Sequence, residues 1–194
     1  MEKLTTLPLK NIAIFASGSG SNAERIYDYF QGDSEVNISM ILCNNPEAGV
    51  IARAERLNIP LVMFDRAALK SGEVVRILQE NDTDWVILAG FLWLIPKNMV
   101  EAFPNKIVNI HPALLPKFGG KGMYGHFVHE AVVANKETES GITIHFVNEH
   151  YDEGNIIFQA SYPVLPTDSP EDVAKKGQVL EHEYFPKVIE ELIK

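Results

Sequence analysis

Apolar and polar residues follow one another along this chain in a pattern that predicts strands separated by helices. Short apolar runs, typical of buried strands, occupy residues 11–16, 36–42, 60–64, 85–89 and 107–110. Apolar residues at helical spacing lie between them, at residues 21–30, 46–57 and 67–80. We expect Ser21 or Asn22 to cap the first of these helices, and Pro46 to lie in the first turn of the second. The order indicates βαβ units, and therefore an α/β fold with an open, mostly parallel, twisted sheet and helices on both faces.

The pattern changes after Gly141. Two strand-like runs, residues 142–147 and 155–162, are joined by a short loop that contains Asp-Glu-Gly, and they predict a hairpin or an antiparallel C-terminal edge of the sheet. Ser169 and Pro170 predict the start of a last helix that runs to the C-terminus, with an interruption near Pro186. No repeat or linker divides the chain, so we expect one domain over residues 1–194.

Composition and charge narrow the class of protein. The 194 residues, 46% hydrophobic and 22% charged, are ordinary for a soluble globular protein with one substantial core. A net charge of −9 argues against a nucleic-acid partner, and no apolar run approaches the ~20 residues of a membrane span. The single cysteine, Cys43, fits a reducing compartment, and residues 1–8 have no apolar stretch of signal-peptide length. We therefore expect a cytoplasmic protein that binds small molecules, as a monomer or a homodimer.

Asn109 and His111 are the strongest catalytic candidates. Because they are two apart on a strand, their side chains project to the same side. Pro112 ends that strand, since it lacks the N–H that the sheet requires, and the carboxyl ends of strands are where open α/β sheets bind ligands. An amide donor beside an imidazole suits a reaction in which a carbonyl carbon becomes tetrahedral. A lone histidine at such a place is structural more often than not, but Asn109 facing the same way favours the catalytic interpretation.

Asp152, in the segment Tyr-Asp-Glu-Gly, has two readings. Asp before Gly is common in turns, so this residue can be a turn residue alone. If its carboxylate faces His111, its charge favours the imidazolium and raises the pKa of that ring. The carboxylate is then also placed to accept a proton from an attacking amine, directly or through water.

The loop Ser-Gly-Ser-Gly-Ser-Asn at residues 17–22 follows the first strand and opens the first helix. Glycines allow close approach of the backbone to a ligand, and the N–H groups of a helix N-terminus favour an anion such as phosphate. The same loop loosely matches a dinucleotide fingerprint, but that fingerprint needs an acidic residue at the end of the second strand. The second strand ends in Cys-Asn-Asn, which disfavours a nicotinamide cofactor. A tight turn that binds nothing is the structural alternative.

Two other groups have a structural and a functional interpretation. Residues 90–96, Gly-Phe-Leu-Trp-Leu-Ile-Pro, are typical of core, yet they follow a strand and can wall a flat aromatic ligand. Gln178 and Glu181 share one face of the last helix. The ordinary interpretation is that this face is exposed to solvent, and the functional interpretation is that it contacts a polar substrate.

The remaining histidines carry weaker signals. His126 and His129 are three apart and can pair on a helix, but no cysteine or carboxylate cluster completes a metal site, so we expect no metal. His145 and His150 are interpreted as strand and loop residues.

In this order, these segments resemble the formyltransferase family that uses 10-formyltetrahydrofolate, and the resemblance covers nearly the whole chain. Within it, the Gly-Ser-Gly-Ser-Asn loop is typical of the branch that formylates glycinamide ribonucleotide in purine biosynthesis. The resemblance implies a Rossmann-like formyltransferase fold. It also implies three catalytic residues, Asn109, His111 and Asp152. The implied ribonucleotide site consists of Gly18, Ser19, Gly20, Ser21, Asn22, Gln178 and Glu181. The implied folate site consists of Leu92, Trp93, Leu94, Ile95, Asn148, Glu149, His150, Tyr151 and Asp152.

The mechanism implied by the resemblance is attack of the glycyl amine on the formyl carbon of the folate. Asn109 and protonated His111 then stabilise the oxyanion, Asp152 keeps His111 charged, and Glu181 holds the amine. The folate carries the formyl group and no metal takes part.

Two segments depart from the family pattern. Residues 117–125 are longer than the corresponding loop of many members and rich in glycine, so we expect a mobile lid, with the contacts of Lys121, Tyr124 and His126 left open. Residues 65–81 look shortened, and a basic residue for the folate tail is Arg66 or Lys70.

Three rival functions remain. A formyltetrahydrofolate deformylase shares the catalytic segment but lacks the Gly-Ser-Gly-Ser-Asn loop, because it has no phosphate to hold. A methionyl-tRNA formyltransferase needs a further domain and a more basic surface. A non-catalytic dinucleotide-binding module predicts protection against heat by nicotinamide cofactor rather than by folate.

Overall fold

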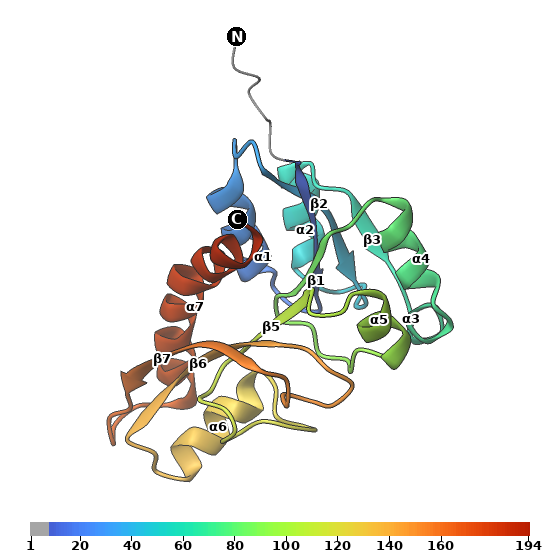
Figure 1. Cartoon of the computed structure of the whole chain (residues 1–194). Coiled ribbons are helices and arrows are strands. Elements are labelled where there is room, and N and C mark those ends of the chain that lie inside the picture. Colours follow the sequence, from blue (N-terminus) through green and yellow to red (C-terminus); the bar gives the residue numbers. More distant parts are fainter. Residues whose placement is uncertain (1–7) are drawn as a thin grey trace.

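In the part of the chain that the structure describes, seven strands form one sheet in the order β3-β2-β1-β4-β5-β6-β7 (Figure 1). The computed structural model describes residues 8–194, so most of the N-terminal stretch without a signal-peptide pattern lies outside the described residues. The strands are β1 (Lys10–Ala16), β2 (Val36–Cys43), β3 (Leu61–Met63), β4 (Trp85–Leu88), β5 (Ile107–His111), β6 (Glu139–Phe146) and β7 (Ile156–Pro163). β1 to β5 pair in parallel, whereas β6 and β7 are antiparallel to their neighbours, which confirms the predicted fold class.

Helices cover both faces of the sheet. They are α1 (Ser21–Phe30), α2 (Val50–Leu57), α3 (Arg66–Ser71), α4 (Glu73–Glu80), α5 (Lys97–Ala102), α6 (His126–Ala134) and α7 (Pro170–Ile193) (Figure 1). Along β1, Ile12 and Ile14 pack in one apolar cluster with α1, α2 and α7. Ala13 and Phe15 pack in another with α3, α4 and α5. Successive side chains of a strand point to opposite faces, so one apolar strand supplies both halves of the core. Among the described residues, no helix is both long enough and apolar enough to cross a bilayer.

The strand order reverses between β1 and β4. The loops that follow these two strands are tied together there. Ala89 N–H donates to the Phe15 carbonyl at 2.9 Å, Ser17 N–H donates to Gly90 O at 3.0 Å, and Leu92 N–H donates to Ser17 Oγ at 3.1 Å. In doubly wound sheets the carboxyl ends at such a switch point form the binding crevice. The glycine loop and residues 90–96 therefore line one crevice although they are far apart in the sequence.

Two helices differ from the sequence prediction. α2 begins at Val50 rather than near Pro46, because Asn45 forms a turn with Pro46 at its second position. Glu47 N–H donates to the Asn45 side chain at 3.1 Å and Ala48 N–H donates to the Asn45 carbonyl at 3.1 Å. The helix predicted over residues 67–80 is two helices, α3 and α4, because Gly72 between them has a φ of 89°.

The start of α1 and the interior of α7 also differ from the sequence prediction. Gly20, not Ser21 or Asn22, is the N-cap of α1, and no side chain caps that helix. The predicted interruption near Pro186 is wrong, since α7 continues from Pro170 to Ile193. Proline removes the N–H that would bond to the carbonyl four residues earlier. That carbonyl, of His182, instead accepts a hydrogen bond from Arg25 Nε of α1 at 3.1 Å, so the helix continues without an unpaired group there.

Candidate active site

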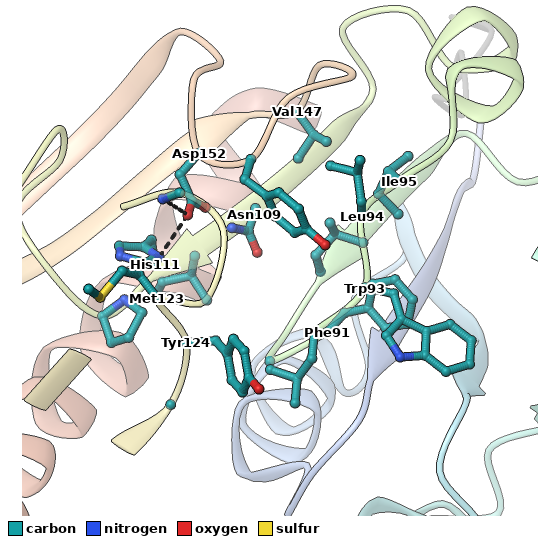
Figure 2. Close-up of a pocket in the computed structure, with 18 of the residues that line it drawn as sticks. Phe91, Trp93, Leu94, Ile95, Asn109, His111, Met123, Tyr124, Val147 and Asp152 are labelled. Atoms are coloured by element: carbon teal, nitrogen blue, oxygen red, sulfur yellow. Dashed lines mark hydrogen bonds and ion pairs between the residues drawn. The ribbon is translucent and has the colours of Figure 1, made fainter. Parts of the chain in front are cut away.

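A cavity of about 730 Å³ opens at the carboxyl ends of β4 and β5 (Figure 2). Asn109 and His111 of β5 lie at its base, and residues 91–95 form one wall. Residues 120–125 and 150–152 approach from the other side. The sheet and three loops therefore bring together the catalytic candidates that the sequence singled out, including Asp152, which is 41 positions from His111 in the chain.

Asn109 and His111 occupy the same face of β5, as the strand period requires. The residues between and beside them, Val108 and Ile110, pack in the core on the opposite face. Across the sheet Asn109 pairs with His145 of β6, and His111 pairs with Thr143. The Asn109 amide lies 3.0 Å from Nε2 of His145 and donates one of its two N–H groups to that nitrogen, which leaves the second for a ligand.

His111 is buried, with 3% of its surface exposed. Its Nε2 donates to the Phe118 carbonyl at 2.8 Å, so Nδ1 is the nitrogen that faces Asp152. Burial lowers the pKa of the ring below its ordinary value, and it outweighs the opposite effects of the Asp152 charge and of the Phe118 carbonyl. The sequence predicted a raised pKa from the carboxylate alone. The carboxylate acts in that direction, but the net shift is the reverse.

The Asp152 carboxylate lies between two histidines. Its Oδ2 is 3.6 Å from Nδ1 of His111, and its Oδ1 is 3.6 Å from Nε2 of His145. Gly120 N–H donates to Oδ2 at 2.9 Å. Burial acts to raise the pKa of Asp152, but the two histidines and this N–H together hold it below its ordinary value. The backbone of Asp152 forms a turn, with a φ of 55°, as one of the two interpretations predicted. Its side chain nevertheless lines the cavity.

His145 belongs to this cluster, and sequence analysis placed it as an ordinary strand residue. Its Nδ1 donates to the Phe146 carbonyl at 2.8 Å, which leaves Nε2 to accept from Asn109. A signal was present in the sequence, because an antiparallel strand beside β5 brings one of its residues opposite Asn109. The residue at that position depends on the register, and spacing alone does not fix the register.

The apolar wall of the cavity comes from residues 91–95. Phe91 packs inward against Phe15, with ring centroids 5.3 Å apart, and Trp93 stands beside Phe91 at 6.2 Å. The guanidinium of Arg66 lies 4.4 Å from the centre of the Trp93 ring. Of the two basic candidates, Arg66 lines the cavity and Lys70 does not. His150 and Tyr151 also line it, whereas Asn148 and Glu149 of the predicted folate site line neither cavity.

A second cavity, of about 430 Å³, adjoins the first over the glycine loop. Gly20 has a φ of 77°, and a Cβ there would lie 2.5 Å from Val50 Cγ2, so this glycine is needed for packing against α2. At Gly18 a Cβ would meet no atom within 4 Å, so its surface faces open space. All seven predicted ribonucleotide residues line this cavity: Gly18, Ser19, Gly20, Ser21, Asn22, Gln178 and Glu181.

The last helix closes the second cavity. Gln178 Nε2 donates to Ser21 Oγ at 3.2 Å, and Asn22 Nδ2 donates to Glu181 Oε2 at 2.6 Å, so the polar residues at the start of α1 bind α7 rather than cap their own helix. Burial raises the pKa of Glu181, although the Asn22 amide acts in the opposite direction. Lys175, which sequence analysis did not single out, brings a positive charge to the lining.

Other predicted features fall around these cavities. Lys121 and Tyr124 line the larger one and His126 the smaller. In residues 8–194 no group of three or more histidine, cysteine or acidic side chains is arranged to hold a metal ion. Asn44, at the place where a dinucleotide site needs an acid, accepts a hydrogen bond from Ser17 Oγ at 2.7 Å.

Comparisons with known proteins identify relatives of this chain. The sequence model of the formyl transferase family matches residues 10–189. The chain is 42% identical over 188 residues to the chloroplastic phosphoribosylglycinamide formyltransferase of Arabidopsis thaliana, covering 93% of this chain and 64% of the relative. Identity to the phosphoribosylglycinamide formyltransferase of Bacillus subtilis is 33% over 192 residues, with 95% of each chain covered. The chain thus spans less than two thirds of the plant relative and nearly all of the bacterial one.

Solved structures of related proteins are similar to this chain over nearly its whole length. Glycinamide ribonucleotide transformylase 1 from Geobacillus kaustophilus superposes with a TM-score of 0.87 at 34% identity, over 96% of this chain and 100% of the other. Phosphoribosylglycinamide formyltransferase from Bacillus halodurans gives a TM-score of 0.86 at 33% identity, over 95% and 96% of the two chains.

Proposed function

The chain belongs to the formyl transferase family, and we propose that it transfers the formyl group of 10-formyltetrahydrofolate to the glycyl amine of 5'-phosphoribosylglycinamide. The products are the N-formyl ribonucleotide and tetrahydrofolate, a step of purine biosynthesis. The observation that carries the proposal is the junction of two cavities, one built around an amide, an imidazole and a carboxylate, the other around a glycine loop at a helix N-terminus.

The two cavities suit the two substrates. The larger one has the apolar wall of residues 91–95 for the flat pterin, with Arg66 placed to meet the carboxylates of the folate tail. The smaller one offers the N–H groups at the start of α1 and the Lys175 ammonium to a phosphate. Glu181 lines both and is placed to hold the amine.

In the proposed reaction a bond forms between the glycyl nitrogen and the formyl carbon, and negative charge develops on the formyl oxygen. Asn109 donates its free N–H to that oxygen. His111 begins neutral and takes the proton of the amine at Nδ1, beside the Asp152 carboxylate, which stabilises the resulting imidazolium. The ring then gives that proton to the folate nitrogen as the bond between this nitrogen and the formyl carbon breaks.

Formyl transfer requires the ribonucleotide, whereas the rival function, hydrolysis of 10-formyltetrahydrofolate, does not. We expect the purified protein to consume 10-formyltetrahydrofolate, followed by the change in folate absorbance, only when glycinamide ribonucleotide is present. Consumption at the same rate without the ribonucleotide would replace transfer by hydrolysis. No change under either condition would refute both.

The proposal extends to a single formyltransferase domain over residues 1–194 that acts in the cytoplasm. The cytoplasmic location rests on the composition and the single cysteine.

A further inference from the structure

His129 is a buried histidine that has no part in the chemistry described above. It lies on α6, with 9% of its surface exposed, and it lines both cavities. The residues common to the two linings define the junction between the cavities, and they are Gly18, Asn22, Gly90, Gly125, His129 and Glu181. Polar side chains from three helices, α1, α6 and α7, thus meet at this junction.

One ring nitrogen of His129 forms no hydrogen bond within the described residues. Nδ1 is buried and has no partner among the described residues. Buried polar atoms are usually paired, because an unpaired one costs about 1–3 kcal/mol. His182 also has a buried ring nitrogen without a partner among the described residues, but only His129 lines the cavities, so the position of its ring is what points to a ligand. Oδ1 of Asn22, at the same junction, is also buried without a partner.

The surroundings of this ring favour its neutral form. Burial lowers the pKa of His129 below its ordinary value, and charge on His111 or His126 would lower it further. Across the junction the Glu181 carboxyl, whose own pKa is raised by burial, is the acidic group of the shared lining. A neutral imidazole carries one N–H. Because an unpaired buried donor is less well tolerated than an unpaired acceptor, that hydrogen belongs on Nε2.

We propose that His129 binds the sugar of the nucleotide substrate, donating a hydrogen bond from Nε2 to a ribose hydroxyl at the junction of the two cavities. This inference rests on the proposed function. In a phosphorylated ribosylamine the sugar separates the phosphate from the amine, just as the junction separates the glycine loop from Asn109 and His111.

The chemistry of the junction matches a sugar rather than an ion. Asn22 Oδ1 and the Glu181 carboxyl accept hydrogen bonds, whereas neutral His129 donates one. Each hydroxyl of a vicinal diol both donates and accepts, so a diol can satisfy all three groups. A metal would need more ligands than the described residues bring together here. A second anion would meet the Glu181 carboxyl and no cation in the shared lining.

The inference is tested with His129→Leu, which keeps most of the side-chain volume and removes the donor. We expect the KM for glycinamide ribonucleotide to rise roughly tenfold, the size of one lost hydrogen bond. The KM for 10-formyltetrahydrofolate should change less than about twofold, and the melting temperature should hold or rise, because Nδ1 has no partner to lose. His129→Gln, which retains a neutral donor, should restore most of the affinity.

A matched control and a substrate analogue separate binding from folding. His182 also has a buried, unpartnered ring nitrogen but lines neither cavity, so His182→Leu should leave the KM for the ribonucleotide unchanged. The ribonucleotide lacking the contacted hydroxyl, tested as its 2'-deoxy and 3'-deoxy forms, should bind wild type more weakly but lose nothing further in His129→Leu.

Two results would overturn the inference while leaving formyl transfer in place. One is an unchanged KM for the ribonucleotide in His129→Leu, and the other is an equal rise in KM for both substrates. If His129→Leu does not fold, His129→Ala, which also removes the donor, takes its place, and losses that add between this substitution and the removal of each hydroxyl would refute the inference as well. Absence of transfer in the wild-type protein would instead refute the proposed function itself.

Discussion

At the scale of single residues, the environment of His111 decides the chemistry. A carboxylate beside an imidazole favours the charged ring, yet burial here has the larger effect and lowers the pKa of the ring. In the proposed reaction a ring that begins neutral acts as a proton acceptor, and Asp152, whose pKa is lowered, remains ionised to stabilise the proton once it arrives. This order of events follows from burial, which sequence alone did not show.

The pair is tested by Asp152→Asn. Removing the carboxylate charge takes away the interaction that favours the imidazolium, so the pKa of His111, already below its ordinary value of 6.5, should fall further. Turnover should fall by about 10²-fold or more, while the melting temperature stays close to that of wild type. NMR titration of the ring protons measures the first effect independently of activity. A pKa of His111 that rises in the variant would contradict the electrostatic account.

We expect Glu181 to affect both the stability of the fold and the binding of the ribonucleotide. Burial raises its pKa above the ordinary value of 4.5, so the folded protein binds this proton more tightly than the unfolded chain does. The stabilising contribution of the protonated carboxyl is present below the unfolded pKa and is lost as the pH rises through the folded pKa. Glu181→Gln, which resembles the protonated form, should therefore raise the melting temperature at about pH 7.5 and have little effect near about pH 4.

The same substitution should weaken binding of glycinamide ribonucleotide, because the variant no longer offers a charge to the amine. Calorimetric unfolding at the two pH values and a titration with the ribonucleotide check both effects. A variant that is less stable than wild type at the higher pH would show that the ionised carboxylate is favourably solvated in the fold.

At the scale of elements, the loop between β1 and α1 contains two glycines with different tasks. Gly20→Ala must place a Cβ 2.5 Å from Val50 Cγ2 and 2.9 Å from its Cα, at a φ of 77°, so we expect a loss of stability of about 2 kcal/mol or more. Gly18→Ala meets no atom, so its stability should be unchanged, but its methyl group should raise the KM for the ribonucleotide alone. Chemical denaturation and steady-state kinetics of the two variants distinguish these effects, and similar losses of stability in both would contradict them.

Residues 117–125 contact both His111 and Asp152. The Phe118 carbonyl accepts from His111, and Gly120 N–H donates to Asp152. If this segment is the mobile lid that its glycines predict, hydrogen exchange of the Gly120 amide should slow when both substrates are bound, because closure would stabilise these contacts. Exchange that is equally slow with and without ligands would contradict the lid.

Strand ends were predicted within one residue except at β6, which begins at Glu139 rather than at residue 142, whereas the start of α2 and the break between α3 and α4 were not predicted. The apolar runs that become β1, β2, β4 and β5 are buried on both faces, so composition alone marks them. The start of α2 depends on the side chain of Asn45, and the continuity of α7 depends on Arg25 reaching a carbonyl from another helix. Such contacts arise from tertiary structure, and neither has a local pattern.

At the scale of the whole molecule, the sheet order explains which site residues could be found. Residues at the carboxyl ends of β1, β4 and β5 were predictable, because a parallel sheet brings those ends to one crevice. His145 and Lys175 were missed, since they enter the site through the register of an antiparallel strand and through the packing of α7 across the glycine loop. The proximity of Asp152 to His111 was an inference from chemistry, and the fold supplies the 3.6 Å contact.

The most direct test of the whole account is to follow the formyl carbon itself. The protein is incubated with glycinamide ribonucleotide and 10-formyltetrahydrofolate that carries ¹³C in its formyl group, and the products are separated and analysed by mass spectrometry. The account predicts that the label appears in the N-formyl ribonucleotide, in amounts that match the tetrahydrofolate released. Label recovered as free formate, with the ribonucleotide unlabelled, would contradict it.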